Sequence, residues 1–81
     1  MIDVKEAVSK AREYSREVLG ETGTVEEIER ELYRNQDVWR ITLGFEVPFR
    51  FSPGPQKEYK SFFIDAETGE TPAMKIRELA V

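Results

Sequence analysis

The sequence predicts an α+β domain in which an N-terminal amphipathic helix packs on an antiparallel β-meander of three or four strands. Three observations carry this prediction: a capping box that opens a helical apolar pattern, a strictly alternating segment at residues 39–51, and an aromatic strand pattern after a proline-rich breaker. With 81 residues and 40% hydrophobic content, the chain can close one hydrophobic core. We therefore expect residues 1–81 to form a single domain.

The predicted helix covers about residues 3–19. Asp3 and Glu6 have the spacing of a capping box, and Gly20 supplies a residue that ends a helix readily. The apolar positions recur every three or four residues, and the inner face is built largely from small side chains. These are Ala7, Ala11 and Ser15. Small residues on this face predict that the helix axis lies close to the sheet.

The segment at about residues 25–34 has two interpretations. Its helix propensity and a second capping-box spacing favour a helix. As a strand, it would place Ile28 and Leu32 on one face and glutamates on the other. The short connection at residues 35–37 is typical of a hairpin, and the next strand needs a pairing partner on each side. We therefore predict a strand here.

The central strand is predicted at about residues 38–50. Every odd-numbered residue from Trp39 to Phe51 is large and apolar, and every even-numbered one is small, polar or charged. This period of two predicts one core face and one wet face. Pro48 interrupts the pattern and predicts an edge or a bulge in its last third. Core packing is the expected role of Trp39 and Phe45.

A third strand is predicted at about residues 57–65, after the breaker Ser52-Pro53-Gly54-Pro55. Phe62 and Ile64 share one face and Phe63 lies on the other, so we expect this strand to be at least partly buried on both sides. A short element at about residues 72–79 completes the domain, as a fourth strand or a last helical turn.

Asp65 and Gly69 are expected to form the turn after the third strand. An aspartate can accept backbone N–H bonds there, and glycine tolerates a positive φ. The alternative is a calcium loop, because Glu67 and Glu70 add carboxylates. The segment lacks the length and the distant bidentate glutamate of an EF-hand, so a structural turn without metal is favoured.

Composition limits the classes of function. The chain has no histidine and no cysteine, which removes the commonest general base and thiolate chemistry, and no cofactor is expected. The net charge of −4 with dispersed basic residues disfavours nucleic acid. There is no apolar run long enough to span a membrane and no signal peptide, which predicts a cytoplasmic protein. If the sequence is a trimmed piece, it would instead be extracytoplasmic.

Three phrases of the sequence resemble the PepSY domain. They are Asp-x-x-Glu-Ala at residues 3–7, Trp-x-Ile-x-Leu at residues 39–43, and Phe-Ile-Asp-Ala-Glu-Thr-Gly-Glu at residues 63–70. The resemblance implies a cystatin-like arrangement, with a helix packed on an antiparallel meander and residues 25–34 as its first strand. It also implies a binding, regulatory or sensing role, in some members directed at peptidases.

The favoured hypothesis is a non-catalytic module that binds a protein or peptide partner. The partner would contact a sheet edge, or Phe49, Arg50 and Phe51 beside the rigid proline turn. The first alternative is a structural homodimer in which Phe62 and Ile64 pack against a second copy. The lesser alternative is a small-ligand-binding protein or a carboxylate-based enzyme with a pocket between helix and sheet. Its candidate carboxylates are Glu27, Glu29, Glu31, Glu46 and Asp65.

Overall fold

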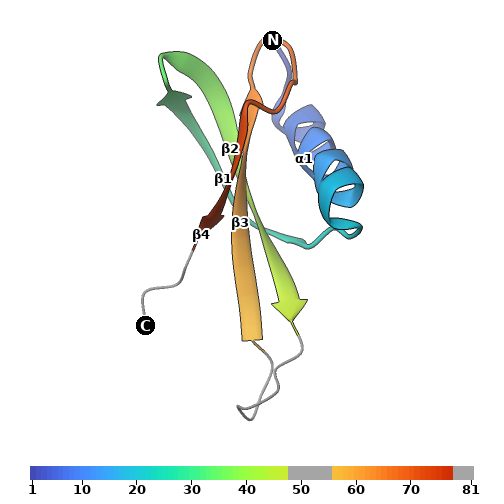
Figure 1. Cartoon of the computed structure of the whole chain (residues 1–81). Coiled ribbons are helices and arrows are strands. Elements are labelled where there is room, and N and C mark those ends of the chain that lie inside the picture. Colours follow the sequence, from blue (N-terminus) through green and yellow to red (C-terminus); the bar gives the residue numbers. More distant parts are fainter. Residues whose placement is uncertain (48–55, 78–81) are drawn as a thin grey trace.

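The computed structural model describes residues 1–47 and 56–77, and Figure 1 shows one helix lying on one side of a four-stranded sheet. The elements are α1 (Val4–Leu19), β1 (Thr24–Tyr33), β2 (Gln36–Val47), β3 (Gln56–Asp65) and β4 (Ala73–Arg77). The strands lie in the sheet in chain order, and each neighbouring pair is antiparallel. The predicted α+β meander is confirmed, and the C-terminal element is a strand.

Helix α1 begins and ends as its sequence predicts. Asp3 Oδ1 accepts a hydrogen bond of 2.9 Å from the N–H of Glu6. At the other end, Gly20 has a φ of 78° and donates its N–H to the carbonyl oxygen of Arg16. The small inner face is fully buried, at Ala7, Ala11 and Ser15. The helix therefore packs closely over β2 and β3, as its small side chains allow.

A two-residue turn joins β1 to β2. Arg34 and Asn35 both have positive φ angles, of 51° and 65°, which is the pattern of a type I′ hairpin turn. Tyr33 pairs with Gln36 directly across it. The predicted hairpin is present, but the connection is shorter than expected because Gln36 and Asp37 already belong to β2. Tight hairpin pairing here overrides the helix propensity of the segment.

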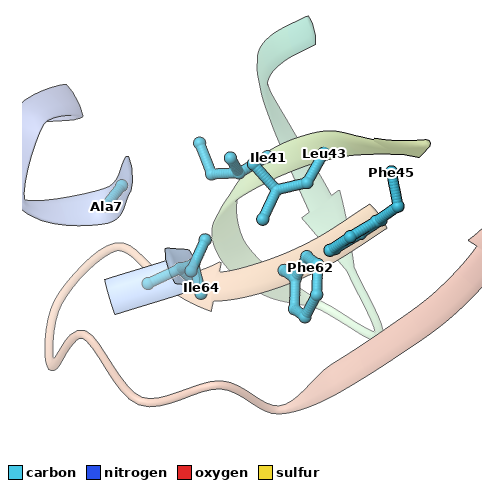
Figure 2. Close-up of a cluster of buried hydrophobic side chains, with 7 residues drawn as sticks. Ala7, Ile41, Leu43, Phe45, Phe62 and Ile64 are labelled. Atoms are coloured by element: carbon cyan, nitrogen blue, oxygen red, sulfur yellow. The ribbon is translucent and has the colours of Figure 1, made fainter. Parts of the chain in front are cut away.

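The hydrophobic core lies between α1 and the sheet. Ile41, Leu43 and Phe45 of β2 and Phe62 and Ile64 of β3 point toward one another beneath the helix (Figure 2). The ring of Tyr14 meets the ring of Phe62 edge-on, with centroids 6.0 Å apart. Trp39 is only partly buried and packs against this core at its margin, so it is not a central core residue.

The sheet face away from α1 is not a simple wet face, which corrects the sequence prediction. Thr42 of β2 is fully buried although its even number predicted a wet position, and Val38, just before the alternating segment, is fully buried too. The hydroxyls of Thr42 and Ser61 are 2.9 Å apart, and the ring of Tyr33 stacks on Phe63 with centroids 4.5 Å apart. Thr42 lies between Glu27 of β1 and Ser61 of β3, and a period of two within one strand cannot reveal such neighbours.

The N-terminal residues are fastened to the turn after β3. Ile2 donates its N–H to the carbonyl oxygen of Ala66 at 2.7 Å, and its own carbonyl accepts the indole N–H of Trp39 at 3.3 Å. Ala66 in turn donates its N–H to the carbonyl oxygen of Asp37. These contacts fix the start of α1 against β2 and β3.

Candidate functional site

The outer edge of β1 is the candidate site, because this strand ends the described sheet on one side. β1 has ten residues and pairs only with β2 among the described strands. In an antiparallel pair, every second residue of an edge strand turns its N–H and C=O away from its neighbour. The other end of the sheet is formed by β4, which has five residues. β1 therefore offers the longer row of unpaired backbone groups.

A β-bulge lies near the start of β1. The register with β2 shifts between Val25 and Glu27, which leaves Glu26 as the extra residue. The side chain of Glu26 lies over Gly44, where an added Cβ would come within 2.9 Å of its Cγ. Its carboxylate binds the ammonium of Lys57 at 3.1 Å, and this hydrogen bond raises the pKa of Lys57. The side chain of Glu26 can therefore lie here only because residue 44 is a glycine.

Three glutamates occupy the face of β1 opposite α1, and we call Glu27, Glu29 and Glu31 the acidic row. Their carboxylates gather around one guanidinium, that of Arg40 on β2. Arg40 is paired with Glu29, and its side chain lies 3.5 Å from Glu31 and 4.0 Å from Glu27. Within this group the carboxylates outnumber the guanidinium, so a strand added at the edge would meet a negative field.

The opposite face of β1 carries an apolar strip, made of Met1, Ile28 and Leu32. Their exposed fractions are 74%, 42% and 73%. Helix α1 packs mainly over β2 and β3, and these three side chains stay exposed beside it. Exposed apolar side chains on an edge strand are typical of a surface that contacts another chain.

Arg30 lies between Ile28 and Leu32 on the helix side of β1. It makes hydrogen bonds with both carboxylate oxygens of Asp37, of which the Nε to Oδ1 bond measures 2.8 Å. Its guanidinium also lies 4.9 Å from the ring centroid of Trp39 and donates to the sulfur of Met1 at 3.4 Å. The hydrogen bonds from Arg30 lower the pKa of Asp37. Arg30 is thus occupied internally and separates Ile28 from Leu32.

The structure places Phe62 and Ile64 fully inside the core beneath α1. A second copy could not contact them without removing the helix. The expected self-association through this pair is therefore corrected: both residues hold the domain together. Phe49, Arg50 and Phe51, the predicted partner contacts, lie outside the described residues.

Asp65 and Gly69 form the turn after β3. Asp65 Oδ1 accepts the N–H groups of Thr68 at 2.9 Å and of Glu67 at 2.7 Å, and its other oxygen accepts the side-chain amide of Gln36. These hydrogen bonds lower the pKa of Asp65, and the bond from the N–H of Thr68 has the largest effect. Gly69 has a φ of 80°, as a turn position of this kind requires. Both carboxylate oxygens are thus occupied, one within the turn and the other by Gln36 of β2.

Within residues 1–47 and 56–77, no group of three acidic side chains is arranged to hold a metal ion. In the same part of the chain, no helix has the length and apolarity needed to cross a membrane. Glu27, Glu29 and Glu31 lie together, as the alternating positions predicted, but in ion pairs with Arg40. Glu46, another candidate carboxylate, is exposed near the end of β2.

Two parts of the site were missed by reasoning from the sequence. The exposure of Leu32 depends on where α1 crosses the sheet, which no local pattern gives. The grouping of Arg40 with the acidic row was available in principle, because Arg40 shares the polar side of its strand with Thr42 and Glu46. A register for the hairpin would have placed Arg40 opposite Glu29.

Comparison with known protein families identifies a match over most of the chain. The family model described as peptidase propeptide and YPEB domain, PepSY, matches residues 1–71. This span includes α1, β1, β2 and β3 and the turn after β3. Comparisons with curated proteins and with solved structures give no significant match.

Proposed function

Because the chain belongs to the PepSY family, we propose that it is a non-catalytic module that binds an extended segment of a protein or peptide along the outer edge of β1. The observation that carries the proposal is the ten-residue edge strand whose outward backbone groups have no described strand beside them. Strand addition at such an edge supplies backbone hydrogen bonds to a partner, and the side chains on the two faces select its sequence.

The exposed side chains of β1 support a binding role over a purely structural one. Natural proteins protect long edges with charges, prolines or covering elements. β1 has such charges and a bulge, but on its helix side it also presents Ile28 and Leu32 to solvent, on either side of Arg30. The family description links such domains to peptidase propeptides, so segments of a peptidase are one class of partner to test.

The proposal is tested by selecting peptides from a displayed random library against the whole chain. Each selected peptide is then measured against the double variant Ile28→Lys/Leu32→Lys, since lysine on an edge strand opposes strand addition. The matched control is Val4→Lys/Val18→Lys, which changes two exposed valines of α1 in the same way. We expect a loss of affinity of about tenfold or more with the edge variant and less than about twofold with the control.

Two results would count against this proposal. If selection yields no saturable ligand, the chain is not a peptide-binding module. If selected peptides bind the edge variant as well as the unchanged chain, binding occurs but not at β1. In that case Arg50→Ala/Phe51→Ala tests the partner contacts expected from the sequence at residues 49–51.

A further inference from the structure

Resting on the proposed function, we propose the chemistry of the segment that β1 receives: an extended strand with basic side chains at every second position and uncharged side chains between them. The acidic row and the apolar strip lie on opposite faces of the same edge, and this juxtaposition carries the inference. A strand added beside β1 presents alternate side chains to these two faces.

The positions follow from the register of β1. The added residues beside Glu27, Glu29 and Glu31 lie on the face away from α1, where lysine or arginine would pair with the carboxylates. The residues beside Ile28 and Leu32 lie on the helix side, where apolar side chains would cover them. Beside Arg30, which is already held by Asp37, a small polar residue fits. The expected pattern is basic, apolar, basic, polar, basic, apolar.

Charge also argues against a second copy as the occupant. An antiparallel pairing of two β1 strands centred on Glu29 would set Glu27 against Glu31 of the other copy. A pairing centred on Arg30 would set Glu29 against Glu31. A parallel pairing of the same two edges turns one copy over, so its acidic row would lie beside Ile28, Arg30 and Leu32 of the other copy, where the one cation, Arg30, is already held by Asp37. Like charges directly opposite in a sheet are destabilising. A register that separates the glutamates shortens the paired length.

Arg40 does not cancel the attraction for a basic strand. Its guanidinium is one cation among the three carboxylates of the acidic row, and it reaches them from β2, on the inner side of β1. The side chains of Glu29 and Glu31 remain 52% and 32% exposed, against 25% for that of Arg40, so both carboxylates stay accessible to an added strand. Two or three exposed charge pairs contribute modestly to affinity but strongly select against acidic partners.

The experiment uses the whole chain and a labelled peptide, Lys-Val-Lys-Thr-Lys-Leu, together with its reversed sequence, because strand addition can be parallel or antiparallel. Control peptides replace each lysine by glutamate, replace each by threonine, or rearrange the same residues as Lys-Lys-Lys-Val-Thr-Leu. Fluorescence anisotropy at low and at high salt measures binding. We expect saturable binding of one alternating basic peptide, weakened by salt, and much weaker binding of every control.

Two further measurements separate edge pairing from general attraction to an acidic protein. Glu29→Gln/Glu31→Gln should weaken binding of the basic peptide by about five- to tenfold. Glu13→Gln/Glu17→Gln changes the net charge equally on α1 and should weaken it by less than about twofold. Methylating the peptide amides at one set of alternate residues should abolish binding, whereas methylating the other set should not, because only one set faces β1.

Several outcomes would overturn the inference. Nonspecific charge attraction would be shown if the rearranged peptide bound as tightly as the alternating one. It would also be shown if Glu29→Gln/Glu31→Gln and Glu13→Gln/Glu17→Gln weakened peptide binding equally. Preference for the glutamate or threonine peptide would refute the basic pattern. A dimer in light scattering that excludes the peptide would make a second copy the occupant. If none of these peptides binds while library selection yields ligands that depend on Ile28 and Leu32, the basic pattern is wrong and the proposed function stands.

Discussion

β1 and β3 pair with opposite sides of β2 over similar lengths, yet their side chains have opposite surroundings. Every residue from Ser61 to Ala66, at the end of β3 and just beyond, is buried, whereas no residue of β1 is. The two strands thus pair with β2 over similar lengths, but their side chains are buried to very different extents. The difference teaches that β3 contributes more buried packing than β1. β1 packs Val25 against the margin of the core and stacks Tyr33 on Phe63, but it leaves Ile28 and Leu32 exposed.

The largest expected effect tests β3. Phe62→Ala should lower the free energy of unfolding by about 3–5 kcal/mol, because it opens a cavity in the core beneath α1. Ile28→Ala in β1 should lower it by about 1 kcal/mol or less, because the side chain is 42% exposed. Urea unfolding measures both. Similar losses of stability at the two positions would contradict the difference in packing between β3 and β1. Phe62→Glu is expected to unfold the chain.

A smaller effect is expected on the face away from α1. Thr42→Val should lower the free energy of unfolding by about 1–3 kcal/mol, because it leaves the hydroxyl of Ser61 buried without its partner. The double variant Thr42→Val/Ser61→Ala should be more stable than the single one, because no orphaned hydroxyl remains. If the double variant loses the sum of the two single losses, the pair is not coupled.

The pH dependence distinguishes the two strands in a third way. The pKa of Asp65 is lowered in the folded state, so its ionised form stabilises the fold at neutral pH. This contribution is lost as pH falls through and below the usual carboxyl range, where the unfolded state binds the proton first. Asp65→Asn should therefore flatten the loss of stability on acidification, measured by urea unfolding at a series of pH values. An unchanged acid dependence would contradict the assignment.

The same measurement applies to Asp37, whose pKa is lowered by hydrogen bonds from Arg30 of β1. The direction of the pH effect is the same as for Asp65. Because this pair is exposed and joins two charged side chains, added salt should reduce its contribution. The backbone donors that hold Asp65 should make its contribution less sensitive to salt. Equal salt sensitivity would remove this distinction.

The smallest effect is expected on the outer face of β1. Leu32→Ser should change the free energy of unfolding by less than about 0.5 kcal/mol, because the side chain is 73% exposed. Urea unfolding of the isolated chain checks this value. A loss above about 1 kcal/mol would mean that Leu32 packs within the domain, and the apolar strip would then not be available to a partner.

The architecture could be predicted because its signals are local. Alternation through Trp39 and Phe45 identified the central strand, and small residues at Ala7 and Ala11 identified the buried helix face. The burial of Val38 and Thr42 could not be predicted in the same way. It depends on the residues of β1 and β3 that flank them in the sheet, and a pattern along one strand contains no information on its neighbours.

The candidate site was predicted only in part for a related reason. A sheet edge was among the expected binding surfaces, and the alternation of Glu29 and Glu31 was visible in the sequence. Which edge stays uncovered depends on the position of α1 across the sheet. The buried positions of Phe62 and Ile64 show the same limit, because an apolar pair on one face of a strand does not reveal whether a helix or another molecule covers it.

The contact between Ile2 and Ala66 has a consequence for folding kinetics. The backbone that receives the start of α1 exists only after β2 and β3 have paired, because Ala66 is itself bonded to Asp37. The helix can form early from local contacts, but its docking must wait for partners that are distant in sequence. We therefore expect the chain to fold more slowly than a helical bundle of equal length, with helix docking among the late events.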